Sequence, residues 1–152
     1  MGKKDEQGET VCRNKKATYL YAIEERIEAG IELAGSEVKS LRQRNADLSD
    51  AYAAIKDDEL FLFQAHIAEY KNAGYRGHEP KRVRKLLMHR HEIRRPSGKL
   101  GERGFTLVPL AIYFKNGWAK LLLGLSKGKR KLDRRKAIQE KDMRRALRKE
   151  HD

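Results

Sequence analysis

The chain has 152 residues and a formal net charge of +13, with 39% hydrophobic and 38% charged residues. This length suits one ordinary domain, and the charge predicts a polyanion as partner, with an anionic membrane surface as the alternative. No stretch approaches the roughly 18 apolar residues of a membrane-spanning helix, and the polar N-terminus lacks the apolar centre of a secretion signal. The single cysteine, Cys12, cannot form an internal disulfide. We therefore expect a cytoplasmic protein.

The first third of the chain begins with a predicted flexible arm, residues 1–13. Apolar and polar residues then alternate over residues 19–33, which predicts two strands or one long bent strand. Ser36 is predicted to cap a short helix that reaches at least Leu41, with Glu37 placed favourably in its first turn.

The middle of the chain is predicted to contain one clear strand, which follows a segment whose secondary structure is ambiguous. Alanines in residues 45–56 favour a helix, whereas the alternation of side chains there suits a strand. Residues 57–58 predict a turn, and residues 59–70 predict a strand with Phe61 and Phe63 in the core.

Glycine and proline mark the boundaries that follow. Residues 71–82 predict an exposed loop, and residues 83–89 a short strand. Residues 91–95 predict a short helix that ends before Pro96, because the residue before a proline disfavours helical geometry.

A hairpin is the clearest local signal, since Asn116 and Gly117 lie between two apolar runs and suit a two-residue turn. With this turn, one face of the hairpin is wholly apolar, and its far end places Val108 opposite Leu125. We expect a bulge or a strand end at Pro109, which cannot donate a backbone hydrogen bond.

The C-terminal part, residues 126–152, has 12 basic and 5 acidic residues and only a thin apolar stripe. It is predicted to be disordered alone and to fold on a partner. The short strands and turns between the arm and this tail predict a mainly β fold. We expect them to form a small barrel at residues 14–125.

Catalytic signatures are weak, because the chain has no glycine-rich phosphate loop, cysteine pair or nucleophile elbow. His89, His91 and Glu92 have the spacing of metal ligands on a strand, but contact with RNA explains them better among so many cations. Further candidates for surface contacts are Tyr19, Tyr75 and His78.

Several motifs match a known family in order along the chain. They are Asn14-Lys15-Lys16-Ala17 with Tyr21, Glu28-Ala29-Gly30-Ile31, Glu37-Val38-Lys39-Ser40-Leu41-Arg42, Ser49-Asp50 with Tyr52, Arg84-Lys85-Leu86-Leu87, Leu107 to Phe114, and Gly124-Leu125 through Gly128-Lys129 to Asp133-Arg134-Arg135. On these motifs the chain resembles the SsrA-binding protein (SmpB) family, the bacterial partners of transfer-messenger RNA in ribosome rescue. The resemblance implies an OB-like closed β-barrel with small helices, a strand at residues 48–55, and a tail that becomes helical on the ribosome.

The resemblance also implies a role and a set of contacts. The protein would be a monomeric adaptor without catalysis, cofactor or metal, which binds the tRNA-like domain of transfer-messenger RNA, promotes its alanylation and joins elongation factor Tu in delivery. The tail would occupy the small-subunit decoding region and the empty mRNA channel. The implied contacts to the tRNA-like domain are Tyr19, Glu28, Leu87 and His89, with support from Lys15, Lys16, Lys39 and Arg84. Those to the decoding region are Gly128, Lys129, Asp133, Arg134 and Arg135.

The chain departs from the family at three places, one of which is His89, where many relatives have Asn. Relatives usually have His followed by an acidic residue where this chain has Tyr19 and Leu20, and often an aromatic or His where it has Leu132. Two rival hypotheses remain: an OB-type ribosomal or ribosome-assembly protein, and a nuclease that uses His89, His91 and Glu92.

Overall fold

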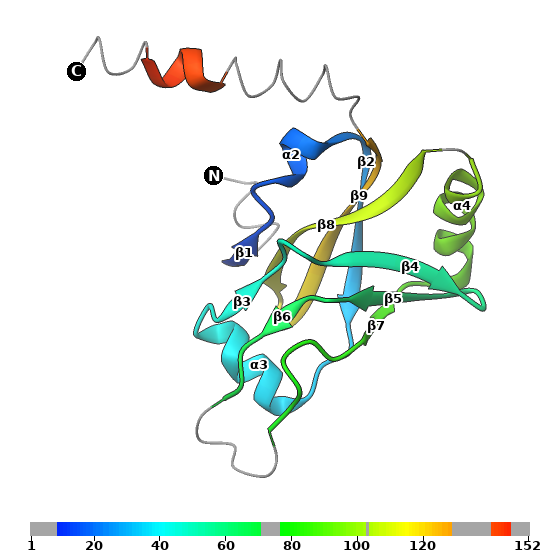
Figure 1. Ribbon diagram of the computed structural model, residues 1–152. Coiled ribbons are helices and arrows are strands. Elements are labelled where there is room, and N and C mark those ends of the chain that lie inside the picture. The colour runs from blue at the N-terminus through cyan, green and yellow to red at the C-terminus, as the bar shows by residue number, and fades with distance from the viewer. Residues whose placement is uncertain (1–8, 71–76, 103, 129–140, 147–152) are drawn as a thin grey trace.

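The computed structural model describes residues 9–70, 77–102, 104–128 and 141–146, and its architecture is mainly β with small helices (Figure 1). The elements in chain order are β1 (Glu9–Arg13), α2 (Ala17–Leu20), β2 (Tyr21–Ile31), α3 (Gly35–Arg42), β3 (Ala46–Asp47), β4 (Tyr52–Lys56), β5 (Glu59–Phe63), β6 (His66–Ile67), β7 (Arg84–Leu87), α4 (Arg90–Leu100), β8 (Phe105–Lys115) and β9 (Trp118–Gly128). Residues 141–146 are helical as well. Within the described ranges, no helix is long and apolar enough to cross a membrane.

The strands form one large antiparallel sheet in the order β1-β8-β4-β5-β7-β2-β9, and β8 also pairs with β9. The pairings from β8 through β4, β5, β7, β2 and β9 therefore return to β8. A short second sheet joins β3 to β6. Helices α2 and α3 lie at opposite ends of the sheet, and α4 lies beside one edge (Figure 1). The predicted mainly β fold is confirmed.

The core contains aliphatic side chains that alternate inward along these strands. Its fully buried members include Leu41, Leu48, Leu60, Leu62, Ile67, Ile112, Leu121 and Leu123. Each such side chain contributes about 1.5–3 kcal/mol relative to exposure in water.

The predicted hairpin is confirmed near its turn. Asn116 and Gly117 have φ angles of 53° and 80°, as this turn type requires. The strands pair from Lys115 opposite Trp118 to Ile112 opposite Leu121, in the register that the turn predicts.

A bulge shifts the far end of the hairpin by one residue. It lies between Pro109 and Ala111, so that Val108 is opposite Gly124 and not Leu125 as we predicted. The bulge accommodates Pro109, which has no N–H for the ladder. The position of the bulge was predicted, but its effect on the register beyond it was not.

Strand β2 is a single long strand with an irregularity between Ile23 and Glu25, which decides between the two alternatives for this region. The strand begins at Tyr21, whereas Tyr19 lies in α2. Toward its end, β2 also pairs with β7 through Gly30 and Ile31, and Gly30 is still paired with Lys120 of β9.

The flexible arm predicted for residues 1–13 is wrong for Glu9–Arg13, because these residues form β1 on the edge of β8. Val11 supplies the reason, since its side chain is buried in the core. Residues 1–8 lie outside the described part of the chain. At the other boundary, β9 extends beyond Leu125 to Gly128.

Two helix boundaries differ from the prediction. Helix α3 is preceded by Ala34 and not capped by Ser36; Glu37 accepts a hydrogen bond from the Ala34 N–H at 2.9 Å. Helix α4 continues through Pro96 instead of ending before it. Ile93 and Pro96 are buried on one side of α4, so packing against the sheet offsets the backbone bond that proline removes.

Residues 45–56 are divided between two strands. Only β4, which begins at Tyr52, fulfils the strand implied for residues 48–55. The Asp47 carboxylate accepts hydrogen bonds from the Ser49 N–H and hydroxyl, both at 2.9 Å. This Asx-type turn interrupts the extended backbone before β4.

The strand predicted at residues 59–70 is also interrupted. Gln64 has a φ of 60°, which ends β5 and resets the alternation of side chains. Leu60 and Leu62 therefore point into the core, whereas Phe61 and Phe63 lie half-buried on the outer face. The prediction that these two phenylalanines belong to the core is wrong.

Candidate nucleic-acid interface

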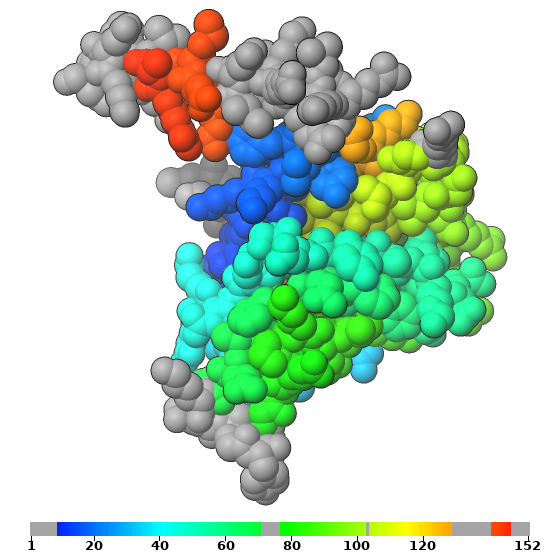
Figure 2. Space-filling model, in the orientation of Figure 1, coloured from blue at the N-terminus to red at the C-terminus, as the bar shows by residue number. Residues whose placement is uncertain are grey.

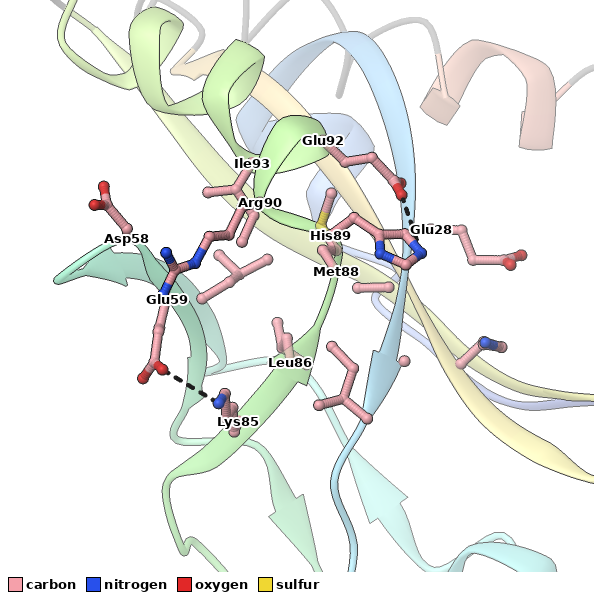
Figure 3. Close-up of a pocket in the computed structure, with 15 residues that line it drawn as sticks. Glu28, Asp58, Glu59, Lys85, Leu86, Met88, His89, Arg90, Glu92 and Ile93 are labelled. Atoms are coloured by element: carbon pink, nitrogen blue, oxygen red, sulfur yellow. Dashed lines mark hydrogen bonds and ion pairs between the residues drawn. The ribbon is translucent and has the colours of Figure 1, made fainter.

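A surface pocket of about 590 Å³ lies where β2, β7 and β9 meet the start of α4 (Figure 3). The main-sheet strands approach here because β2 pairs with both β7 and β9. The residues that line the pocket are Glu28, Ala29, Gly30, Asp58, Glu59, Leu60, Lys85, Leu86, Leu87, Met88, His89, Arg90, Glu92, Ile93 and Lys120. Three residues of the expected RNA contact, Glu28, Leu87 and His89, are thus brought together.

Glu28 is held by two side chains from β8. Its Oε2 atom accepts a hydrogen bond from the Tyr113 hydroxyl and lies 3.6 Å from Lys115 Nζ. Burial raises the pKa of Tyr113, and the hydrogen bond to Glu28 and its charge raise it further, so the hydroxyl stays a donor. The Glu28 side chain is still 37% exposed and can accept hydrogen bonds from a ligand.

Leu87 supplies an apolar surface to the same pocket and is 51% exposed. It lies opposite Gly30 in the β2–β7 pair. A Cβ on Gly30 would lie 3.2 Å from the Leu87 Cβ, which is closer than an ordinary contact. The close approach of the two strands therefore favours glycine at position 30, because a larger residue would have to push Leu87 away by a few tenths of an ångström.

His89 is at the N-terminal boundary of α4 and not on a strand as its spacing suggested. Its side chain is 80% exposed, and its Nε2 atom lies 4.0 Å from Glu92 Oε1 (Figure 3). The rings of His89 and His91 stack at a centroid distance of 5.5 Å. The described residues contain no group of three or more His, Cys, Asp or Glu arranged to hold a metal ion.

The expected lysine contacts do not line this pocket. Lys15 and Lys16 are exposed just before α2, and Lys39 is exposed on α3, at the opposite end of the sheet (Figure 1). Lys39 Nζ lies 5.4 Å from the centre of the Tyr70 ring. Tyr19 in α2 is half-buried, and Lys141 Nζ from the C-terminal helical segment lies 4.5 Å from its ring centre.

Arg84 cannot make the RNA contact that we expected, because its side chain has no exposed surface. Its Nε donates to Glu37 Oε2, and its other nitrogens donate to the carbonyls of Ala65, Arg82 and Pro80 at 2.8–3.0 Å. The residue braces α3 against β7 and the chain that precedes β7.

His78 is buried as well and is corrected as a surface candidate. Its Nδ1 lies 2.8 Å from Ser36 Oγ, and its Nε2 lies 2.8 Å from the Ile67 carbonyl. Tyr75 lies outside the described residues.

Of the residues expected to meet the decoding region, only Gly128 is described, and it is exposed at the end of β9. The other four lie outside the described residues: Lys129, Asp133, Arg134 and Arg135.

Sequence reasoning missed the partners of Glu28 and two cations of the pocket, Arg90 and Lys120. The turn at Asn116 and Gly117 is enough to place Tyr113 opposite Lys120. The sequence did not indicate that β2 runs beside β9 at Lys120, because the pairing of Gly30 with Lys120 joins segments that are distant along the chain.

These features define a class, a small and strongly basic mainly β protein whose surface pocket combines a held carboxylate, an exposed leucine and cations. The family model described as "SmpB protein" matches residues 11–152. The chain belongs to the SmpB protein family, as its motifs predicted.

Individual relatives agree with this assignment. The SsrA-binding protein of Anaeromyxobacter sp. (strain Fw109-5) is 53% identical over 146 residues, 96% of this chain and 88% of the relative. That of Geobacter metallireducens is 50% identical over 137 residues, 90% of each chain. A solved structure described as "tmRNA-SmpB: a journey to the center of the bacterial ribosome" is similar with a TM-score of 0.68 and 46% identity, covering 84% of this chain and 93% of that one.

Proposed function

We propose that this chain is an RNA-binding adaptor of ribosome rescue, or trans-translation. It binds the tRNA-like domain of transfer-messenger RNA, promotes its alanylation, and accompanies it with elongation factor Tu to stalled ribosomes. It acts as a monomer and catalyses no reaction. The observation that carries the proposal is the assembly of Glu28, Leu87 and His89 around one pocket in a member of the SmpB family.

The pocket has the chemistry to recognise exposed groups of folded RNA. The Glu28 carboxylate accepts hydrogen bonds from base amino groups or ribose 2′-hydroxyls, which are the donors that RNA offers. Leu87 packs against a base or a ribose, and the exposed imidazole of His89 stacks or donates a hydrogen bond.

Exposed cations outside the pocket supply affinity without base recognition. Lys15, Lys16 and Lys39 are exposed, and each contributes by contact with phosphates and release of counterions. Tyr19 follows Lys15 and Lys16 along the chain, and a base stacks on its half-buried ring in place of Lys141, whose Nζ lies 4.5 Å from the ring centre.

We further propose that the circuit of strand pairings is the OB-like closed barrel of the RNA-binding body, and that this body spans residues 9–128 instead of 14–125. The limits follow from β1 and β9, whose residues pair with the rest of the sheet. The remaining tail becomes helical in the decoding region and the mRNA channel. Residues 141–146 are already helical in the free chain, so the expectation of a tail that is disordered alone is wrong for them. Gly128, Lys129, Asp133, Arg134 and Arg135 make the contacts where the tail begins.

Binding of purified protein to transfer-messenger RNA, in competition with ribosomal RNA fragments, tests the proposal. Glu28→Gln removes the charge of the pocket carboxylate and should weaken binding by roughly 10-fold or more, the effect of losing hydrogen bonds to a charged acceptor. Glu24→Gln changes another exposed glutamate of β2 and should bind normally. A wild-type protein without preference for transfer-messenger RNA would favour the ribosomal or assembly protein instead.

Two truncations test the division of labour. Deletion after Gly128 should leave binding to transfer-messenger RNA near normal and abolish alanine transfer on stalled ribosomes. Deletion after Leu125 also removes the pairs that residues 126–128 make with β2 and β8, and should lower the thermal unfolding temperature as well. If the deletion after Gly128 weakened RNA binding as much as alanine transfer, the proposed roles of body and tail would be wrong.

A further inference from the structure

The outer face of β4 and β5 presents exposed apolar side chains that the RNA pocket does not use. We define this aromatic face by Tyr52, Ala54, Phe61, Phe63 and Val83. Tyr52 is 49% exposed, and Val83, just before β7, is 48% exposed. The two strands lie at the front of the molecule, where the space-filling view shows this side uncovered (Figure 2).

The centre of the face is a pair of stacked rings. Tyr52 and Phe63 are cross-strand neighbours, and their ring centres lie 5.1 Å apart with planes inclined by 12°. Their outward direction is fixed because Ala53 and Leu62, the next pair, are buried in the core. A rigid aromatic pair of this kind offers contact area with little loss of side-chain entropy on binding.

The charges around the aromatic face distinguish it from the rest of the molecule. Acidic and basic residues at its borders are equal in number, although the chain as a whole carries +13. The acidic ones are Asp47, Asp50, Asp57, Asp58 and Glu59, and the basic ones are Lys16, Lys56, Lys81, Arg82 and Lys85. Lys85 is moreover paired with Glu59 at 3.3 Å. Apart from Lys16, which we assign to phosphate contacts, this balance gives a polyanion little attraction to the face, whereas a protein surface with an apolar centre and a mixed-charge rim complements it.

Trp118 illustrates the opposite environment. It is 74% exposed at the start of β9, directly opposite Lys115, and Lys120 follows two residues later. Both lysines belong to the surroundings of Glu28, so this aromatic side chain lies on the basic surface expected to meet RNA.

We propose that the aromatic face docks a protein component of the ribosome-bound rescue complex, one that presents an apolar patch rimmed by charges of both signs. Tyr52 and Phe63 are the anchors, and Val83 extends the contact. The inference rests on the proposed rescue function but concerns other side chains than the RNA pocket, which the face adjoins at Asp58, Glu59 and Lys85. It assigns the two faces of the body to two classes of partner.

A photocrosslinking probe at the face tests this assignment. The full chain with p-benzoylphenylalanine in place of Tyr52 is assembled with transfer-messenger RNA and stalled ribosomes and then irradiated. We expect a crosslink that survives ribonuclease and disappears with protease. The same probe in place of Trp118 is the matched control and should crosslink RNA. Crosslinking of position 52 to RNA alone, to a second copy of this chain, or to nothing would overturn the proposal.

A substitution provides an independent readout. The double variant Tyr52→Ser, Val83→Ser should lower alanine transfer on stalled ribosomes by about 10-fold or more, as truncation of interface anchors does. Its affinity for transfer-messenger RNA should stay within about twofold of wild type, which also shows that the variant folds. An equal loss of RNA binding, or undiminished alanine transfer, would contradict docking of a protein here. If the proposed rescue function were wrong, the wild-type protein itself would fail to bind transfer-messenger RNA, which is a different result from either of these.

Discussion

Replacing Glu37 with glutamine should destabilise the folded protein by about 3–5 kcal/mol, the range for breaking a buried ion pair. The side chains of Glu37 and Arg84 are both fully buried and hydrogen-bonded to each other. Glutamine has nearly the same shape but no charge, so the Arg84 guanidinium would keep only backbone carbonyls and the partial charge of an amide as partners. Arg82, whose side chain is 39% exposed, would lose its carboxylate too but can turn to water.

Thermal unfolding followed by circular dichroism measures this loss. At about 2–4 °C per kcal/mol for a protein of this size, Glu37→Gln should lower the unfolding temperature by roughly 6–20 °C. The matched control is Glu59→Gln, which removes an exposed ion pair with Lys85 and should cost at most about 1 kcal/mol. If both variants unfolded within a degree or two of wild type, the buried pair would not be holding α3 against β7.

The same pair predicts a dependence on pH. Burial alone would raise the pKa of Glu37, but hydrogen bonds from Arg82, the Ala34 N–H and Arg84 hold it below its usual range. A carboxyl whose pKa is lower in the folded state stabilises the fold above the unfolded pKa of about 4.3, and this stability is lost as the pH falls through the folded pKa. The difference in stability between wild type and Glu37→Gln should therefore shrink below about pH 4. A difference that is constant from pH 7 to pH 3 would contradict this account.

Three further predictions concern the pocket and its surroundings. Tyr113→Phe should weaken binding to transfer-messenger RNA several-fold in titrations, but not when combined with Glu28→Gln, because the hydroxyl acts only by holding that carboxylate. Gly30→Ala should cost about 1–3 kcal/mol in denaturant unfolding through crowding between β2 and β7, whereas Gly98→Ala on the open side of α4 should be neutral or stabilising. Lys16→Ala should lower the salt slope of RNA binding by about 0.7–0.9, and an unchanged slope would remove this lysine from the phosphate contacts.

The hairpin could be predicted from the sequence because residues close together in the chain determine its turn and its register. Asn116 and Gly117 set the turn, and the turn sets the register as far as the next irregularity. The bulge beside Pro109 then shows the limit of the argument, because the direction in which a bulge moves the register depends on the strands on either side.

The errors arose where distant segments determine the outcome. Phe61 and Phe63 have the spacing of core residues, but Gln64 resets the alternation and Leu60 and Leu62 face inward instead. Arg84 resembled a surface cation because nothing local indicates the partner in α3 that allows its burial. The candidate RNA-binding residues around Glu28 could be reached only by resemblance to a family, since β2 meets β9 across about a hundred residues of chain.

Under the proposed function, the carboxylate of Glu28 makes a strongly basic protein selective among RNAs. A charge of +13 attracts any RNA, and this attraction does not distinguish one RNA from another. A carboxylate repels phosphates that approach without offering a donor, and it favours a ligand that presents an amino or hydroxyl group at that point. Specificity is a difference between affinities, so a group that weakens the wrong complexes contributes to it as much as one that strengthens the right complex. Tyr113 and Lys115 keep the carboxylate in place among the cations, and it follows that Glu28→Gln should reduce the preference for transfer-messenger RNA more than it reduces binding to RNA in general.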